Sequence, residues 1–101
     1  MAELPVSQKY YNQTLLISEF ISLIKKEAES GSRITDVHFA PFVKGYDITF
    51  MKGNNAIRLS VSCRKVFDGC ILKIYEDNEL TDKVIIKTKD DVGNYIARII
   101  Q

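Results

Sequence analysis

The centre of the chain alternates apolar and polar residues with a period of two. One phase carries Tyr46, Ile48, Phe50, Ile57, Leu59, Val61, Cys63, Cys70, Leu72 and Ile74. Most residues between them are polar or charged. This period is typical of strands with one buried and one exposed face. The pattern therefore predicts an antiparallel sheet and identifies the side chains on its exposed face.

The first turn signal joins a strand over 46–52 to the next strand. Gly53 and Asn54 tolerate the positive φ that tight hairpin turns require. With these two residues as the loop, the inward cross-strand pairs are Phe50 with Ile57, Ile48 with Leu59 and Tyr46 with Val61. Three apolar pairs on one face make a consistent register.

An earlier strand is expected over residues 34–39, with Val37 and Phe39 inward. Pro41 follows directly, and proline removes a ladder donor and restricts the residue before it. We therefore expect residues 40–42 to interrupt this strand.

Asp68-Gly69 is the second hairpin signal and leads into a strand over 70–76. If these two residues are the loop, Cys63 faces Ile74 and Cys70 faces Phe67, too far apart for a disulfide. Only a wider loop, with residues 64–69 outside the ladder, places the two cysteines opposite each other. We favour the first register, with two reduced thiols in the core.

The fifth strand is expected over 80–87, after a turn at residues 76–78 with Asn78 in the left-handed conformation. Its inward positions are Leu80, Val84 and Ile86. The alternation weakens here, because Asp82 also falls inward and Ile85 outward. An inward charge on an edge strand is a known protection against sheet-to-sheet aggregation.

Helical spacing predicts a first helix from Ser7 to Ser30. Its apolar stripe is Tyr10, Gln13, Ile17, Phe20, Ile21, Ile24 and Ala28. Ser7 is the expected N-cap, with Asn12 or Thr14 as alternatives if the first turns are extended. Gly31 suits a left-handed C-terminal cap.

A second helix follows Thr88, a favoured N-cap residue, with Asp90 and Asp91 in the first turn. Its apolar stripe is Val92, Tyr95, Ile96, Ile99 and Ile100. Both stripes need a partner surface, and the inward face of the sheet is the one available. The sequence therefore predicts a single α+β domain over 1–101: N-terminal helix, five-stranded antiparallel meander and C-terminal helix, with both helices on one face.

Composition limits the function classes. The chain has 101 residues, 46% hydrophobic and 27% charged, with a net charge of +1. This is an ordinary composition for a soluble protein, without the strong basic excess of many nucleic-acid binders. No secretory signal and no membrane-spanning run is recognisable. We therefore expect a cytoplasmic protein that does not associate with membranes.

Catalysis is not indicated. His38 is the single histidine and falls on the outward phase near Asp36. A histidine–carboxylate pair can act as a general base, but neither a nucleophile nor a glycine-rich loop accompanies it. Cys63 and Cys70 lack zinc-site spacing. We expect no enzymatic activity, no cofactor and no metal.

The outward phase gathers basic and hydroxyl side chains and is the candidate binding site. Its members are Thr49, Arg58, Ser60, Ser62, Arg64, Lys73, Tyr75, Lys83 and Lys87. Asp47 is the one clear acid on this phase, and Met51, Ile71 and Ile85 add apolar spots. Such residues can hold phosphates, stack on bases or contact a protein. They also occur on any antiparallel sheet face that is simply solvated.

The strands and capped helix over 46–100 resemble, in topology, the single-strand-binding transcription coactivators, which combine a β-meander with one helix. No sequence motif is shared, and the N-terminal helix departs from that family. Because fold analogy alone does not carry function, the resemblance implies only a similar arrangement of strands and helix.

Two functions are consistent with the sequence. The first is a small non-enzymatic interaction module that docks on a larger protein, such as the accessory, immunity or inhibitor proteins of phages and mobile elements. The second is a nucleic-acid-binding protein that uses the basic sheet face. A homo-oligomer formed through an exposed edge strand is also compatible with the pattern.

Overall fold

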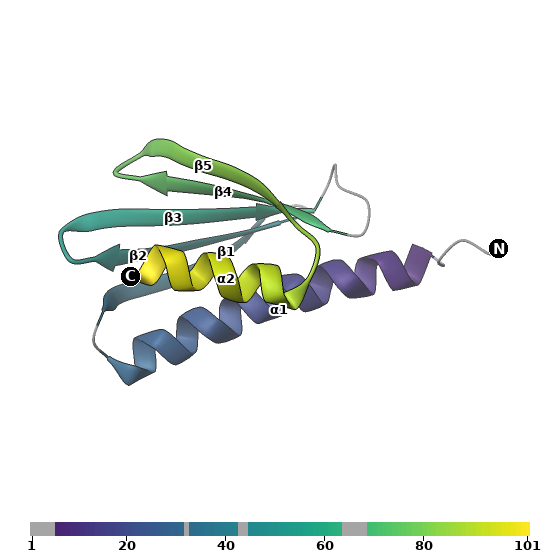
Figure 1. The fold of residues 1–101 in the computed structure, drawn as a ribbon, viewed down its shortest axis with the longest axis horizontal. Helices are drawn as coiled ribbons and strands as arrows, with labels where there is room; N and C mark the ends of the chain where they lie inside the picture. Colours follow the sequence, from purple (N-terminus) through teal and green to yellow (C-terminus); the bar gives the residue numbers. More distant parts are fainter. Residues whose placement is uncertain (1–5, 32, 43–44, 64–68) are drawn as a thin grey trace.

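The structure is a computed structural model that describes residues 6–31, 33–42, 45–63 and 69–101, with side chains in the first helix from Asn12 onward. Its elements are α1 (Val6–Ser30), β1 (Ile34–Phe42), β2 (Gly45–Lys52), β3 (Asn55–Ser62), β4 (Cys70–Glu76), β5 (Glu79–Ile86) and α2 (Lys89–Ile100). The strands form one antiparallel sheet in the order β1-β2-β3-β4-β5 (Figure 1). The predicted α+β meander flanked by two helices is confirmed.

Both helices lie on the same side of the sheet, and α2 lies alongside α1 (Figure 1). The residues that they bury are Leu16, Phe20 and Ile24 from α1 and Val92, Ile96 and Ile100 from α2. These pack with Ile48, Leu59 and Leu72 at the centre of the sheet, which are fully buried. Leu16 was missing from the predicted stripe of α1. Burial of this apolar surface is the main source of stability.

The predicted caps at Gly31 and Thr88 are confirmed, whereas the predicted N-cap of α1 is wrong. Gly31 has a φ of 83°, and its N–H donates to the Glu27 carbonyl at 3.2 Å. Helix α1 begins at Val6 and so runs through Ser7, Asn12 and Thr14, the three expected N-caps. Thr88 is the N-cap of α2, as predicted.

The hairpin of β2 and β3 has the predicted register. Phe50 lies opposite Ile57, Ile48 opposite Leu59 and Tyr46 opposite Val61. The turn is Gly53-Asn54, and Gly53 has a φ of 60°. Turn chemistry and alternation agree here, and the register follows from both.

Strand β1 differs from the prediction in two ways. It continues through Pro41 to Phe42, with Pro41 opposite Tyr46. This is possible because β1 is an edge strand, where the missing N–H of proline faces away from the sheet. A bulge between Thr35 and His38, with Asp36 at a φ of 54°, also inserts one residue.

The register of β3 and β4 corrects the prediction for the cysteines. Ser62 lies opposite Ile71, so Cys63 and Cys70 follow as the next opposite pair. Their Sγ atoms are 2.6 Å apart. The favoured tight loop at Asp68-Gly69 is therefore wrong, and the wider-loop alternative is right.

Strand β5 contains a second bulge, which corrects the position of Leu80. Leu80 lies opposite Tyr75 while Asp82 lies opposite Ile74, so Thr81 is the extra residue. The bulge turns Leu80 outward instead of inward and leaves Asp82 on the inward phase. Asn78 is left-handed as predicted, with a φ of 71°.

Among the described residues, no helix combines the length and hydropathy needed to cross a membrane.

Candidate functional site: the open face of the sheet

The side of the sheet that faces away from the helices is called the open face here. Its side chains form three rows that cross the strands from β1 to β5. The rows are His38, Thr49, Arg58, Tyr75 and Leu80; Ala40, Asp47, Ser60, Lys73 and Lys83; and Phe42, Gly45, Ser62, Ile71 and Ile85. No described helix or strand packs on this face.

The structure brings most of the predicted site residues together on the open face. These are Thr49, Arg58, Ser60, Ser62, Lys73, Tyr75 and Lys83. Arg64 lies outside the described residues. Lys87 follows the end of β5, and its backbone N–H donates to Asp91 Oδ2 at 3.0 Å. Lys87 therefore belongs to the start of α2 instead of the sheet.

Arg58 is held between two neighbours. Its guanidinium lies 4.0 Å from the centre of the Tyr75 ring. One guanidinium nitrogen lies 3.9 Å from Asp47 Oδ2. Asp47 Oδ1 is buried and has no hydrogen-bond donor among the described residues. The cation–π and ion-pair contacts fix the arginine across β2, β3 and β4 and use one face of the tyrosine ring.

Two lysines on the middle row face each other. Lys73 of β4 lies directly opposite Lys83 of β5. The ion pairs within the described part of the chain are Arg58–Asp47 and Lys89–Glu19, so neither lysine is neutralised there. Like charges in directly opposite positions destabilise a sheet. The pair therefore presents a concentrated positive charge that an acidic group could offset.

Large apolar side chains are exposed on the same face. Phe42 is 41% exposed, Leu80 55% and Ile85 61%. The fourth large exposed apolar side chain among the described residues is Leu15 of α1. The sequence predicted only Ile85 in this set, because the continuation of β1 past Pro41 and the bulge at Thr81 were not foreseen. Extending the alternation of β1 past the proline would have placed Phe42 outward.

The ring of Phe42 depends on Gly45 beside it. A Cβ built on Gly45 would lie 2.2 Å from Cζ of Phe42 and 2.5 Å from the Val61 carbonyl oxygen. Contacts of this length do not occur in folded proteins, so only glycine fits here. The glycine leaves room for the phenyl ring beside it.

An open hollow of about 430 Å³ lies at the other end of the open face. Its lining includes Asp36, His38, Thr49, Met51, Arg58 and Tyr75. No hydrogen bond or ion pair joins His38 to another described residue. The hollow offers mixed polar and apolar contacts, without an oriented base or a partner nucleophile.

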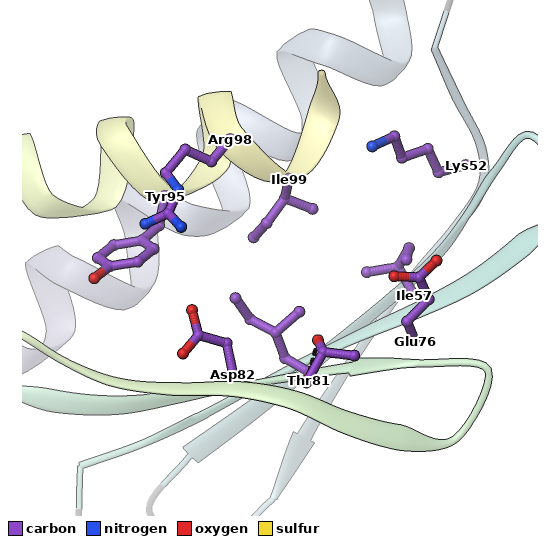
Figure 2. Close-up of a pocket in the computed structure, with 9 residues that line it drawn as sticks. Lys52, Ile57, Glu76, Thr81, Asp82, Tyr95, Arg98 and Ile99 are labelled. Atoms are coloured by element: carbon purple, nitrogen blue, oxygen red, sulfur yellow. Dashed lines mark hydrogen bonds between the residues drawn. The ribbon is translucent and has the colours of Figure 1, made fainter.

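A second hollow, of about 280 Å³, lies between α2 and the sheet (Figure 2). Its lining combines apolar side chains such as Ile99 with four charged ones, Lys52, Glu76, Asp82 and Arg98. Two cations and two carboxylates balance each other, so the hollow has no preference for one sign of charge. Its threonine, Thr81, already donates to the Ile74 carbonyl at 3.1 Å.

Within the described ranges, no cluster of three or more histidine, cysteine or acidic side chains could hold a metal ion. Comparison with protein-family models finds no match. Searches of curated proteins and of solved structures likewise find no similar protein.

Proposed function

We propose that this protein is a non-enzymatic interaction module whose open face docks on an acidic, partly apolar surface of a larger protein. The observation that carries the proposal is the segregation of exposed apolar groups. Three of the four large exposed apolar side chains of the described chain, Phe42, Leu80 and Ile85, share one face with Lys73 and Lys83. Phe42 lies on the edge strand β1, and Leu80 and Ile85 lie on the opposite edge strand β5. Exposed apolar side chains that share a face with charged groups are typical of protein-binding sites.

The charge on the open face supports an acidic partner. Lys73 and Lys83 repel each other, and a carboxylate placed between them would relieve the repulsion. Arg58 is already paired with Asp47, so it contributes less net positive charge. The two lysines would thus favour an acidic partner, while the exposed side chains of Phe42, Leu80 and Ile85 would supply apolar contact area.

A protein partner fits this surface better than a nucleic acid. Neutralising a phosphate backbone takes several unpaired cations, whereas the described open face offers two lysines and a paired arginine. The Tyr75 ring has one face covered by Arg58, which leaves a single face for base stacking. By docking its open face on the larger protein, this protein would cover part of the partner's surface, as an accessory or inhibitory protein does.

Affinity capture from the native host with a matched pair of variants tests the proposal. Lys73→Glu/Lys83→Glu inverts the charge of the open face and keeps a like-charged cross-strand pair, so its stability should equal that of the wild type. Lys26→Glu/Arg33→Glu makes the same total charge change at exposed positions away from this face. Any captured protein is then purified, and its binding is measured by calorimetry.

The expected result is a partner that binds the wild type and the control variant alike. The open-face variant should bind about tenfold to a hundredfold more weakly. Equal binding of all three proteins would exclude the open face as the site. Anisotropy with labelled DNA and RNA completes the test, because sub-micromolar binding that falls steeply with salt would make a nucleic acid the ligand.

A further inference from the structure

The two cysteines lie opposite each other just after the end of β3 and at the start of β4. Ser62 and Ile71 are the last paired residues of these strands, and Cys63 and Cys70 are the next opposite positions. Both side chains are on the inward phase, where Cys70 is fully buried and Cys63 partly buried. Directly opposite residues of an antiparallel pair have Cβ atoms about 4.5–5.5 Å apart, close to what a disulfide spans.

Gln13 of helix α1 connects the end of β3 to the start of β4 by two hydrogen bonds. Nε2 of Gln13 donates to the carbonyl oxygen of Cys63 and to that of Gly69, both at 3.0 Å. One amide group thus bridges the backbone at both cysteines. This clamp limits how far the two thiols can separate in the folded protein.

The two thiols differ in acidity and access. The hydrogen bond between the two thiols lowers the pKa of Cys63, even though burial opposes the shift. The same hydrogen bond, burial and the charge on Cys63 all raise the pKa of Cys70. Cys63 is therefore the nucleophilic, reachable thiol, and Cys70 is the buried thiol behind it.

We propose that Cys63 and Cys70 form a reversible redox site, which small-molecule disulfides such as oxidised glutathione convert to an intramolecular disulfide. The Cys63 thiolate attacks one sulfur of the oxidant and breaks its S–S bond, which releases one thiolate and leaves a mixed disulfide on Cys63. Cys70 then loses its proton and attacks Cys63 Sγ, which releases the second thiolate. Two electrons pass to the oxidant, and the two cysteine protons end on the two released thiols.

The second step is favoured by a change in local charge. Once Cys63 is in the mixed disulfide, it carries no negative charge. The charge of Cys63 then no longer raises the pKa of Cys70, and Cys70 loses its proton more easily. Cys70 already lies against Cys63 Sγ, so resolution is intramolecular and faster than attack by a second small thiol. The mixed disulfide should therefore not accumulate.

The test is a redox titration of the native protein in buffers of oxidised and reduced glutathione. After acid quenching, free thiols are alkylated in denaturant and the intact mass is measured. The folded wild type should pass directly from two alkylated thiols to none, with the loss of two hydrogens and no glutathione adduct. The midpoint should lie about thirtyfold further toward reducing conditions than in denaturant, because the fold holds the thiols together.

Single-cysteine variants assign the roles of the two thiols. Cys70→Ala should accumulate one glutathione on Cys63, whereas folded Cys63→Ser should stay unmodified because Cys70 is buried. Gln13→Leu removes the two hydrogen bonds to the strand ends. The redox midpoints of the folded and the denatured protein should then differ by less than about thirtyfold. Circular dichroism checks the fold of each variant, and the wild-type titration decides the matter if a variant does not fold.

Three results would overturn the proposal. They are equal midpoints in the folded and denatured protein, retention of both thiols under oxidising buffer, and a stable glutathione adduct on the folded wild type. The site does not depend on the open face, so its failure would leave the proposed docking function untouched.

Discussion

The two faces of the sheet are built by the same strands and differ in almost every physical respect. The covered face carries Leu59 and its neighbours, fully buried beneath two helices. The open face carries opposed lysines and large exposed apolar side chains. Alternation separates most of the two sets, since adjacent residues point to opposite sides of a strand, and the bulge at Thr81 places Leu80 on the open face.

The difference shows which residues the fold requires. Burial under the helices stabilises the covered face at roughly 25 cal/mol for each Å² of apolar surface removed from water. The open face has no such gain, and we expect the like charges of Lys73 and Lys83 at directly opposite positions to cost stability. Residues that do not stabilise the fold are the ones to test for binding. Substitutions on the two faces should therefore differ in their effect on the free energy of unfolding.

The largest contrast is expected between two adjacent residues of β3. Leu59→Ala should lower the free energy of unfolding by about 2–5 kcal/mol, because it leaves a cavity in the core. Ser60→Ala, on the open face, should change it by less than about 0.5 kcal/mol. Denaturant titration of both variants measures the difference. Similar losses at the two positions would contradict the division of the sheet into a structural and a free face.

Gly45→Ala probes a tightly packed position on the open face. The added Cβ meets the Phe42 ring and the Val61 carbonyl oxygen, so we expect a loss of about 1–3 kcal/mol in unfolding free energy. Gly93→Ala in α2 is the matched control, because no atom outside the local helix backbone and the two adjacent residues lies within 4 Å of its Cβ position. That helical substitution should stabilise by about 0.5–1 kcal/mol.

Truncating the ring separates the two contacts at Gly45. If Phe42→Ala/Gly45→Ala regains part of the loss, the regained part measures the clash with the ring, and the remainder comes from the Val61 carbonyl. A Gly45→Ala variant as stable as the wild type would mean that neither the Phe42 ring nor the Val61 carbonyl oxygen lies as close to Gly45 as described.

The sequence predicted the parts of the fold where several local signals agree. The hairpin of β2 and β3 is correct because the Gly53-Asn54 turn and the alternation require the same register. The helix caps at Gly31 and Thr88 are likewise set by local chemistry. The positions of both helices on one face followed from their apolar stripes.

The errors arise where alternation gives no information. Moving Cys63 from Ile74 to Cys70 shifts the register by an even number of residues, which keeps every side chain on its face. The contacts that distinguish the registers include hydrogen bonds from Gln13, which is far away in sequence. The bulges at Asp36 and Thr81 likewise add one residue without a sequence marker.

These errors changed the candidate site more than the fold. The Thr81 bulge moves Leu80 to the open face, and the extension of β1 adds Phe42. The predicted basic residues were mostly placed correctly, but the exposed apolar groups that favour a protein partner were largely missed. Such groups are hard to identify from sequence because an apolar residue is expected inside.

The covered face also depends on the start of α2, which a pH titration can test. Asp91 Oδ2 accepts hydrogen bonds from the backbone N–H groups of Lys87 and Thr88, which lower the pKa of this carboxyl below its usual 3.8. Its contribution to stability is therefore present above that value and is lost as the pH falls through the lower, folded-state pKa.

We expect Asp91→Asn to flatten the acid limb of the stability profile below about pH 4, whereas Asp90→Asn, outside the capping box, should leave it steep. At neutral pH, Thr88→Ala should cost about 1 kcal/mol, since it removes the hydroxyl that accepts from the Asp91 N–H. Denaturant titrations at several pH values provide both measurements. Identical acid limbs in the wild type, Asp91→Asn and Asp90→Asn would argue against the capping contact.

The smallest effect is the most informative about function. Lys83→Glu places a carboxylate opposite Lys73 and should raise the free energy of unfolding by about 0.2–1 kcal/mol, because repulsion becomes attraction. Lys83→Gln should give a smaller gain, and Lys73→Glu/Lys83→Glu should return stability to the wild-type value. If Lys83→Glu stabilises the fold and weakens capture of the partner, the lysine pair is retained for binding at the expense of stability. A destabilised Lys83→Glu variant would show instead that the lysines do not repel, and the charge argument for an acidic partner would fail with them.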